Sequence, residues 1–369
     1  MKRYCGWLKI KMTIHSLLQT TIDRGASDLH LVSGYAPTIR VDGVLIPLSE
    51  TVLTPKEIDS LLSTLINDER KKTLEQNHEL DFAYTFGPGR FRVNAYFQRD
   101  TPAVAFRLIP MKIKTIDELN LPPICHDFSN LRQGFILVTG PTGHGKSTTI
   151  AAIIEEINQK YGGHILTVED PIEYVYSPSK AIVSQRELGT DTHSWLNALR
   201  SALREDPNIV FIGEMRDYET IEAALTVAET GHLVFATLHT NSASQSIDRV
   251  VSVFPENQQA QIRLQLAGTL EAVISQRLIP VIGGGRMPAL EILLGTSAVR
   301  ATIREGKTHL LDNIIQTSAD SGMLTMDMSL AKMTVSGKIL VETAASYAAH
   351  PEDLNNLIKK ANLHEAVRI

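Results

Sequence analysis

The sequence predicts a two-domain α/β protein whose larger, carboxyl-terminal domain is built on a doubly wound parallel sheet. In that part of the chain, short and nearly continuous apolar runs alternate with helical segments, as expected when helices cover both faces of a sheet. The length of 369 residues exceeds the usual size of one domain, and the apolar fraction of 43% is ordinary for a globular chain. We therefore expect a second, smaller domain.

Residues 13–110 predict this smaller α+β domain. Apolar residues at helical spacing predict a first helix from Ile14 to about Gly25. A second helix is expected after the capping residue Thr54, with Pro55 at its first position and Glu57 at its third. Strands are expected at Asp28–Val32, Thr38–Val41, Phe91–Phe97 and Ala103–Ile109.

Residues 111–124 contain lysines and a proline pair, and this composition predicts a linker. Residues 125–369 form the second predicted domain, in which the region from about 290 onward is mostly helical and Gly283-Gly284-Gly285 marks a turn. The loops at the carboxyl ends of parallel strands should hold the ligand. The strands are expected at Phe135–Val138, Ile165–Val168, Ile209–Ile212 and Leu233–Leu238.

A glycine-rich loop between the first of these strands and the next helix is the strongest functional signal. Residues 140–147 match G-x-x-x-x-G-K-[ST], in which backbone N–H groups and the helix N-terminus bind phosphate oxygens. Lys146 reaches the β- and γ-phosphates, and the Ser147 hydroxyl is a ligand for Mg²⁺. The sequence therefore predicts ATP and Mg²⁺ as cofactors. The expected contacts are Gly140, Pro141, Thr142, Gly143, His144, Gly145, Lys146, Ser147 and Thr148.

An acidic cluster follows the second strand. Phosphoryl transfer needs a coordinated Mg²⁺ and a positioned water molecule, and carboxylates supply both functions. We assign Glu173 as the catalytic base, with Glu169 or Asp170 supporting the metal. The alternative is a capped acidic turn with a structural role.

A second acidic cluster follows the third strand. A Walker B strand ordinarily ends in aspartate, but Gly213 occupies that position here and Glu214 is the first carboxylate. We assign Glu214 to the Mg²⁺ shell, where ligation through water is favoured over direct ligation. The alternative is a structural carboxylate at the start of a helix.

Two histidines, His232 and His239, bracket the fourth strand. A histidine that leaves such a strand can contact the γ-phosphate and report its loss, because small environmental shifts change its charge near neutral pH. The interpretation as a sensor is stronger for His239, and a structural role is about as well supported for His232.

An arginine-rich strand is predicted in the amino-terminal domain. Its period of two places Arg90, Arg92 and Asn94 on one face, and Arg107 on the next strand is a candidate to join them. Guanidinium groups stabilise a transferring phosphoryl group, also across subunits. A solvated strand face is the alternative.

Charge and composition exclude several classes of protein. The net charge of −5 disfavours a direct nucleic-acid partner. The two cysteines, Cys5 and Cys125, form neither a disulfide framework nor a four-cysteine zinc module. No apolar run is long enough to span a bilayer, and the basic start lacks the apolar region of a signal peptide. We expect a cytoplasmic protein that starts at Met1 or Met12.

Together these motifs resemble the type IV pilus retraction ATPases, the PilT-like branch of the type II/IV secretion ATPase superfamily. The resemblance extends from Ile14 to Ile339 and includes the amino-terminal pattern Gly25–His30. It implies a PAS-like amino-terminal domain, a RecA-like ATPase core and a homohexamer whose ATP sites are completed by arginines of a neighbouring subunit. It further implies a position at the inner face of the cytoplasmic membrane, at the pilus base. There the ring would act on the pilin machinery through an inner-membrane platform protein. Depolymerisation of the pilus would then drive twitching motility.

One motif departs from the family. The retraction signature A-I-R-N-L-I-R is here Ala298-Val299-Arg300-Ala301-Thr302-Ile303-Arg304, which keeps both arginines but not the central Asn-Leu. A pilus-assembly or type II secretion ATPase usually carries a four-cysteine zinc module and a further domain, and neither is evident here. A type IV secretion ATPase stays an alternative, and a DNA-translocating RecA-like motor is disfavoured by the acidic balance.

Overall fold

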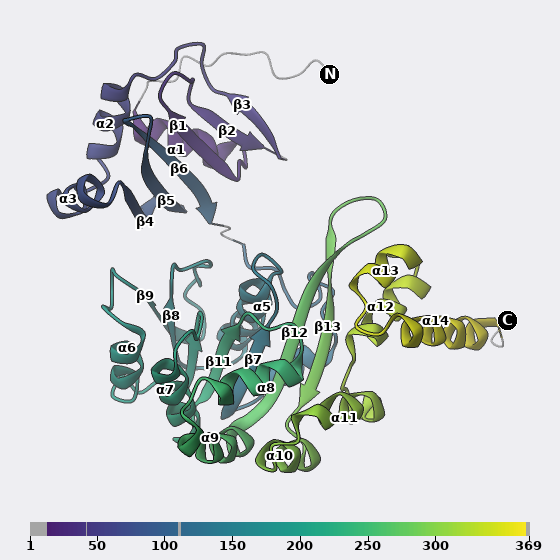
Figure 1. Ribbon diagram of the computed structural model, residues 1–369. Helices are drawn as coiled ribbons and strands as arrows, with labels where there is room; N and C mark the ends of the chain where they lie inside the picture. Colours follow the sequence, from purple (N-terminus) through teal and green to yellow (C-terminus); the bar gives the residue numbers. More distant parts are fainter. Residues whose placement is uncertain (1–12, 42, 110–111, 367–369) are drawn as a thin grey trace. The chain divides into compact units, whose positions relative to one another are not determined.

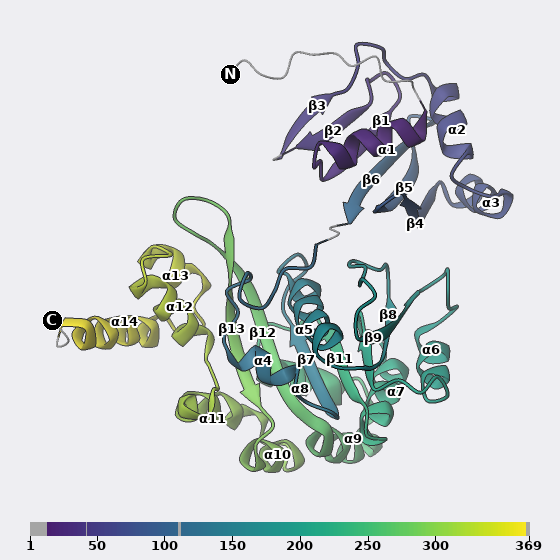
Figure 2. The same cartoon turned by 180° about the vertical axis from the view of Figure 1, so that it is seen from behind.

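The computed structural model describes residues 13–41, 43–109 and 112–366, and the chain divides into two compact units (Figures 1 and 2). The first unit contains the chain up to Lys112 together with Glu173–Val175. The second contains Ile113–Ile172 and Tyr176–Ile369, so most of the predicted linker groups with it. Met1, Cys5 and the alternative start at Met12 lie outside the described residues.

The amino-terminal unit contains an antiparallel six-stranded sheet in the order β3-β2-β1-β6-β5-β4. The predicted second helix is confirmed with its cap, since Thr54 and Glu57 exchange side-chain and backbone hydrogen bonds. The sequence did not predict β3, β4 or α3. The strands are β1 (Asp28–Val32), β2 (Thr38–Val41), β3 (Val44–Pro47), β4 (Glu79–Phe86), β5 (Gly89–Gln98) and β6 (Thr101–Ile109). The helices are α1 (Ile14–Asp23), α2 (Pro55–Ser63) and α3 (Asp68–Asn77).

The alternation predicted for β5 is present. Phe91, Val93 and Ala95 are fully buried in the core of this unit, while Arg92 between them is exposed. Arg92 lies directly opposite Arg107 of β6 in the antiparallel register. The two arginines therefore share the outer face of the sheet, as expected.

The second unit is built on a seven-stranded sheet in the order β13-β12-β7-β11-β10-β8-β9. The four predicted strands are confirmed as β7, β8, β10 and β11, but the sheet is mixed, since β13 runs antiparallel to β12. The long hairpin of β12 and β13 turns at Gly283–Gly285, where a turn was predicted. The strands are β7 (Gly134–Thr139), β8 (Gly163–Glu169), β9 (Ala181–Glu187), β10 (Ile209–Ile212), β11 (Leu233–Leu238), β12 (Leu270–Pro280) and β13 (Arg286–Leu294).

Helices cover both faces of this sheet, with α7 and α8 on the face seen in Figure 1 and α4 and α5 on the face seen in Figure 2. These helices are α4 (Ile124–Phe128), α5 (Lys146–Lys160), α6 (Trp195–Ala202), α7 (Tyr218–Glu229), α8 (Ala243–Ser252) and α9 (Glu256–Thr269). The region after β13 is helical, as predicted. It contains α10 (Ser297–Arg304), α11 (Leu311–Thr317), α12 (Met326–Val335), α13 (Val341–Tyr347) and α14 (Pro351–Ala366), with short 3-10 turns at Thr308–Leu310 and Ala319–Ser321.

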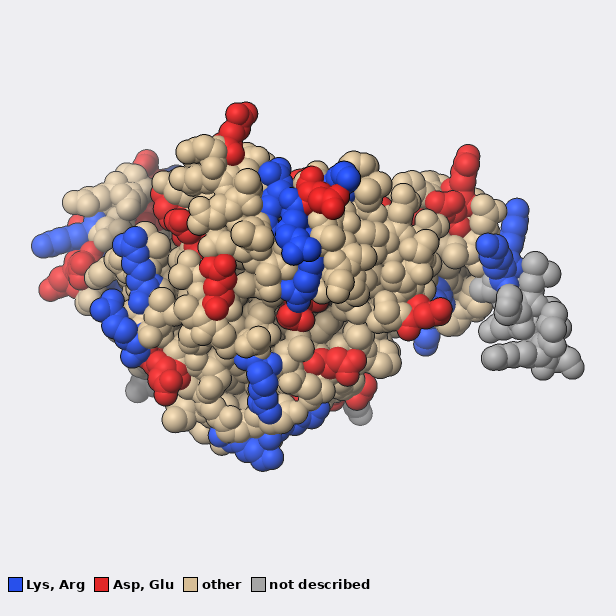
Figure 3. All heavy atoms as spheres, turned by 90° about the horizontal axis from the view of Figure 1, so that it is seen from below, with Lys and Arg blue, Asp and Glu red and all other residues tan. Residues whose placement is uncertain are grey.

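Basic and acidic side chains are interspersed on the face of the molecule that Figure 3 shows. Within residues 13–41, 43–109 and 112–366, none of the helices combines the length and the apolar character that a membrane span requires.

Candidate nucleotide site

The glycine-rich loop connects β7 to α5 at the carboxyl edge of the sheet, in the predicted strand–loop–helix context. Gly140, Gly143 and Gly145 have φ values of +140°, +78° and +84°, which side chains disfavour. A Cβ on Gly140 would lie 2.3 Å from the backbone oxygen of Gln276 on β12. Gly145 is the N-cap of α5 and offers no side chain to its first N–H groups, which point toward the loop without intrahelical partners. This geometry fits phosphate oxygens.

Lys146 is nearly buried, with 8% of its surface exposed. Its Nζ donates to the backbone oxygens of Gly140 at 2.8 Å and Pro141 at 3.2 Å, and lies 3.4 Å from Nδ1 of His239. A buried ammonium group is therefore fixed against the loop. It is the group that Coulomb attraction would bring to the β- and γ-phosphates.

His144 is tied to β12. The backbone N–H of Leu278 donates to its Nδ1 at 3.1 Å, and Gln276 Nε2 donates to its backbone oxygen at 2.8 Å. Burial lowers the pKa of His144, and the charges of Arg277, Arg286 and Lys146 lower it further. The neutral ring thus accepts a hydrogen bond from β12. This agrees with the expectation that the backbone of the loop, and not this side chain, binds the phosphates.

Gln276 was not predicted as part of the site. Its Oε1 accepts from the Thr149 hydroxyl at 2.6 Å, and its Nε2 bonds the loop backbone. Gln276 is 2% exposed, and these two bonds hold the loop and the start of α5 against β12. No local signal marks it in the sequence, because the contact joins residues more than a hundred positions apart.

A charged cluster lies beside the loop, at the ends of β10 and β11. His239 Nε2 is 3.1 Å from Glu214 Oε1, and Arg216 Nη2 donates to Glu214 Oε2 at 2.8 Å. The other ring nitrogen of His239 lies 3.2 Å from the hydroxyl of Thr142. Lys146, His239, Glu214 and Arg216 therefore form one continuous chain of polar contacts. The sequence predicted the members of this chain, except for Arg216.

Glu214 is held ionised in this cluster. Burial by itself would raise its pKa, but the hydrogen bond from Arg216 and the charges of His239 and Arg216 outweigh burial and lower the pKa. The pKa of Arg216 is raised, chiefly by Glu214 and to a smaller extent by the charge of Asp170. A fixed carboxylate next to a phosphate loop fits the outer shell of a hydrated Mg²⁺.

Gly213 has a physical reason to stand where aspartate is usual. A Cβ there would lie 3.2 Å from the Cα of Glu169 and 3.3 Å from the backbone oxygen of Val168. Its N–H donates to the Val168 oxygen, and the Thr237 hydroxyl donates to the Gly213 oxygen. A side chain at this position would therefore crowd the main chain of β8, which would have to shift by a few tenths of an ångström to accept it.

The acidic residues after β8 point in different directions. Glu169 is 4% exposed and accepts from the Thr167 hydroxyl at 2.7 Å and from Gln185 at 3.3 Å. Asp170 is exposed and acts on the charge of Arg216. Asp170 is thus connected to the charged cluster through Arg216. Glu173 is exposed on the loop toward β9, and its assignment as the base stays a prediction.

His232 lies away from the loop. It precedes β11, and its Nδ1 is 3.0 Å from both the Thr230 hydroxyl and the Val227 oxygen. In the parallel register Leu233 pairs with Gly134 and Leu238 with Thr139, so His232 and His239 lie at opposite edges of the sheet. A strand of this length separates them by about 20 Å. Within one chain, the structure therefore brings only His239 to the loop.

Arg90, Arg92 and Arg107 belong to the amino-terminal unit. Arg107 Nε donates to Asp28 at 3.0 Å, and Arg92 lies 3.5 Å from Asp81, with about half of its side chain exposed. Burial would raise the pKa of Asp28, but hydrogen bonds from Ser27 and Arg107 lower it. The role of the three arginines in catalysis stays a prediction.

A cavity of about 300 Å³ opens directly beside the loop. Gly145, Thr148 and Thr149 form its floor, and β12 and β13 contribute one side. It can accept the part of a nucleotide that extends from the phosphates.

The described part of the chain holds no group of three or more His, Cys, Asp or Glu side chains that could bind a metal ion. The residues at the loop fit a cation such as Mg²⁺, which would take the Ser147 hydroxyl as its one protein ligand and phosphate oxygens and water as the others.

The carboxyl-terminal signature forms α10. Val299 and Ile303 are buried in the core of the second unit. Arg300 donates to the backbone oxygens of Gly295, Ala267 and Gly268 and pairs with Glu271 at 2.8 Å, which binds α10 to the end of α9. The two departures, Ala301 and Thr302, are half-buried and take no part in these bonds.

Comparison with known proteins agrees with this geometry. The profile of the family described as "Type II/IV secretion system protein" matches residues 7–333. The "Type IV pilus retractation ATPase PilT" of Pseudomonas aeruginosa is 48% identical over 93% of this chain and all of its own length. The "Twitching motility protein" of Neisseria gonorrhoeae is 43% identical over 96% of each chain. The "Crystal Structure of the Pilus Retraction Motor PilT and Bound ADP" superposes with a TM-score of 0.87 at 45% identity, covering 94% of this chain and all of the other.

Proposed function

We propose that this chain, which belongs to the type II/IV secretion system protein family and to its PilT-like branch, is an ATP-driven motor of type IV pilus retraction. It is an ATP hydrolase, and twitching motility is the process that it supports. One arrangement carries the proposal. Lys146 lies against a glycine loop and connects through His239 to the ionised Glu214.

The loop and Lys146 bind the triphosphate. Nζ of Lys146 has three N–H bonds, and β- and γ-phosphate oxygens compete for them with the loop carbonyls. The N-terminal N–H groups of α5 would bind the remaining charge. Thr148 lines the cavity beside the loop and would contact the α-phosphate. These groups orient the tail and stabilise the charge that develops on the γ-phosphoryl group.

The carboxylates order the water and the cation. The Ser147 hydroxyl would be a ligand for Mg²⁺ and Glu214 would hold the water shell of the ion, with support from Asp170 or Glu169; the ion would neutralise negative charge on the phosphates. Glu173 would take the proton of the attacking water. His239 touches both Lys146 and Glu214, and through these contacts it would sense loss of the γ-phosphate.

The motor is proposed to act as a homohexamer. Arg92 and Arg107 share one exposed face and, with Arg90, would complete the ATP site of a neighbouring subunit. The ring would dock on an inner-membrane platform protein at the cytoplasmic side of the pilus base and reach the pilin machinery through it. We expect no direct contact with nucleic acid.

Replacing Lys146 by alanine tests the nucleotide site. We expect loss of ATP binding and turnover, measured by titration with a fluorescent ATP analogue and by phosphate release. Normal binding by the folded Lys146→Ala chain would refute the proposed site. Deleting the gene tests the biological role, because cells without a retraction motor should carry more and longer pili.

A pilus-assembly or secretion ATPase of the same family is the alternative function. Bald cells after deletion would favour assembly, and unchanged pili with a lost secreted protein would favour secretion. The two cysteines in the sequence leave no four-cysteine zinc module, which favours retraction.

A further inference from the structure

The cavity beside the phosphate loop has one wall that is neither helix nor strand. Lys114, Glu118, Leu119, Asn120 and Leu121 form this wall, opposite Leu278, Arg286 and Pro288 of the β12–β13 hairpin. A ligand that filled the cavity would contact both of these groups of residues and the loop. The position of residues 114–121, here called the wall segment, therefore sets the width of the cavity.

The wall segment has its own internal fold. The Thr115 N–H donates to Glu118 Oε2 at 3.0 Å, and the Glu118 N–H donates to the Thr115 hydroxyl at 3.1 Å. Backbone N–H groups of Leu119 and Asn120 close the turn. Ile116 is fully buried and Leu121 nearly so, which anchors the segment to the second unit. These contacts shape the segment internally, and a polar contact at Asp117 connects it to the rest of the second unit.

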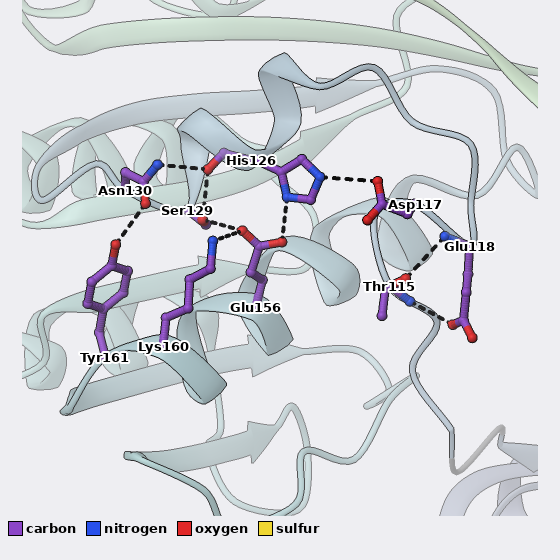
Figure 4. A network of polar contacts seen from close by, with 9 residues as sticks. All are labelled: Thr115, Asp117, Glu118, His126, Ser129, Asn130, Glu156, Lys160 and Tyr161. Carbon is purple, nitrogen blue, oxygen red and sulfur yellow. Dashed lines mark hydrogen bonds and ion pairs between the residues drawn. The ribbon is translucent and has the colours of Figure 1, made fainter.

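That polar contact runs through His126 of α4 to the helix that begins at the phosphate loop (Figure 4). His126 Nε2 is 3.3 Å from Asp117 Oδ1, and Nδ1 is 2.7 Å from Glu156 Oε2 of α5. Glu156 also accepts from the Ser129 hydroxyl at 2.7 Å and from Lys160. The ring thus lies between a carboxylate of the wall segment and a carboxylate of α5.

The protonation state of the ring decides whether both contacts form. A neutral imidazole has one N–H donor, so it can donate to only one of the two carboxylates, whereas the imidazolium ion donates to both. Burial would lower the pKa of His126, but the hydrogen bonds and charges of Glu156 and Asp117 outweigh it and raise the pKa. The charged groups that face the ring are Asp117, Glu156 and, beyond Glu156, Lys160.

We propose that His126 is a positioning residue for nucleotide binding, which holds the wall segment against α5 through Asp117 and Glu156 and so keeps the cavity at the width of the bound nucleoside. This inference rests on the proposed function of the loop as an ATP site. His126 does not touch the cavity itself. It acts through Asp117, which is three residues from Lys114 and next to Glu118, both of which line the cavity.

The expected effect is on affinity and depends on pH. Below the raised pKa of His126 both contacts are made, and as the pH rises through it the Asp117 contact is lost. Because Asp117 is 85% exposed and the buried Ile116 still anchors the segment, the change is modest. Contacts of this kind alter an equilibrium constant by about two- to fivefold.

The experiment compares the full-length chain with three variants: His126→Gln and Asp117→Asn, which break the contact from either side, and His309→Gln, an exposed histidine elsewhere in the same unit. Dissociation constants for a fluorescent ADP analogue are measured between about pH 6 and 9. The ratio of variant to parent at each pH cancels the titration of the nucleotide's own phosphates. Melting temperatures and steady-state ATPase kinetics are recorded alongside.

We expect both contact variants to bind about two- to fivefold more weakly near pH 6.5, with the ratio falling toward one as the pH rises. KM for ATP should rise with kcat unchanged, and His309→Gln should match the parent. Equal affinity of parent and contact variants at every pH would overturn the inference while leaving the ATP site intact. Weaker binding that follows a lowered melting temperature at all pH values would also overturn it. A parent chain that binds no nucleotide would refute the proposed function itself.

Discussion

Replacing Glu214 by glutamine isolates the charge of the carboxylate at the end of β10. The amide keeps the volume and one oxygen for Arg216 or His239, which lie 2.8 Å and 3.1 Å from the carboxylate. It removes the negative charge that we propose to hold the water shell of Mg²⁺. We expect kcat to fall about 10- to 100-fold, equivalent to about 1.4–2.7 kcal/mol of transition-state stabilisation. Nucleotide affinity should stay within about twofold, because Lys146 and the loop amides supply it.

Phosphate release at saturating ATP measures the turnover of the Glu214→Gln variant, and titration with a fluorescent nucleotide measures binding. The Glu214 side chain is 23% exposed, so loss of its ion pairs should cost at most about 1 kcal/mol of folding stability. Glu229→Gln, which changes an exposed carboxylate at the end of α7, is the matched control. Turnover of Glu214→Gln equal to that of the parent would refute the assignment of Glu214 to the metal shell.

Three further predictions concern other parts of the chain. Arg92→Ala should lower turnover at least about tenfold in assembled rings only, and equal loss in isolated subunits would reject action across the interface. Gly213→Ala should destabilise the fold by about 1–3 kcal/mol in urea denaturation, because its Cβ meets Glu169 and Val168; unchanged stability would contradict that packing argument. Burial raises the pKa of Glu291 from its ordinary value of 4.5 to about 7. The folded state therefore binds a proton more tightly, and stability is lost as the pH rises between these values. Glu291→Gln should abolish that loss in melting curves between about pH 5 and 8, and an unaltered pH dependence would exclude Glu291 as its source.

The sequence predicted correctly those elements that depend only on residues close to one another in the chain. The loop at Gly140–Ser147 needs a strand before it and a helix after it, and all three are contiguous. The cap of α2 is likewise contained within Thr54–Glu57. Strand β3 was missed because it is largely exposed and shows no alternation. Strands β12 and β13 were both missed, because their pairing depends on a contact across a turn, and local propensity does not encode strand order.

The two histidines that flank β11 show what sequence reasoning about the site could have done better. His232 precedes the strand and His239 follows it, and the predicted strand alone already places them at opposite edges of the sheet. The burial of Glu169 and the exposure of Asp170 follow from the same kind of argument, since the side chains of consecutive residues at a strand end point to opposite sides. By contrast, Gln276 and His126 reach the site through contacts that only the folded chain reveals.

The β12–β13 hairpin joins two parts of the second unit that the sequence treats separately. Near Gln276 its main chain approaches Gly140 so closely that a methyl group would not fit between them. Further along, Ile279 and Ala289 of the same hairpin form one apolar cluster with Met326, Leu330 and other residues of the carboxyl-terminal helices (Figure 1). Packed groups at such distances cannot interpenetrate, and close-packed interiors transmit strain. A displacement of the phosphate loop toward β12 must therefore be absorbed by this hairpin or passed along it to α12.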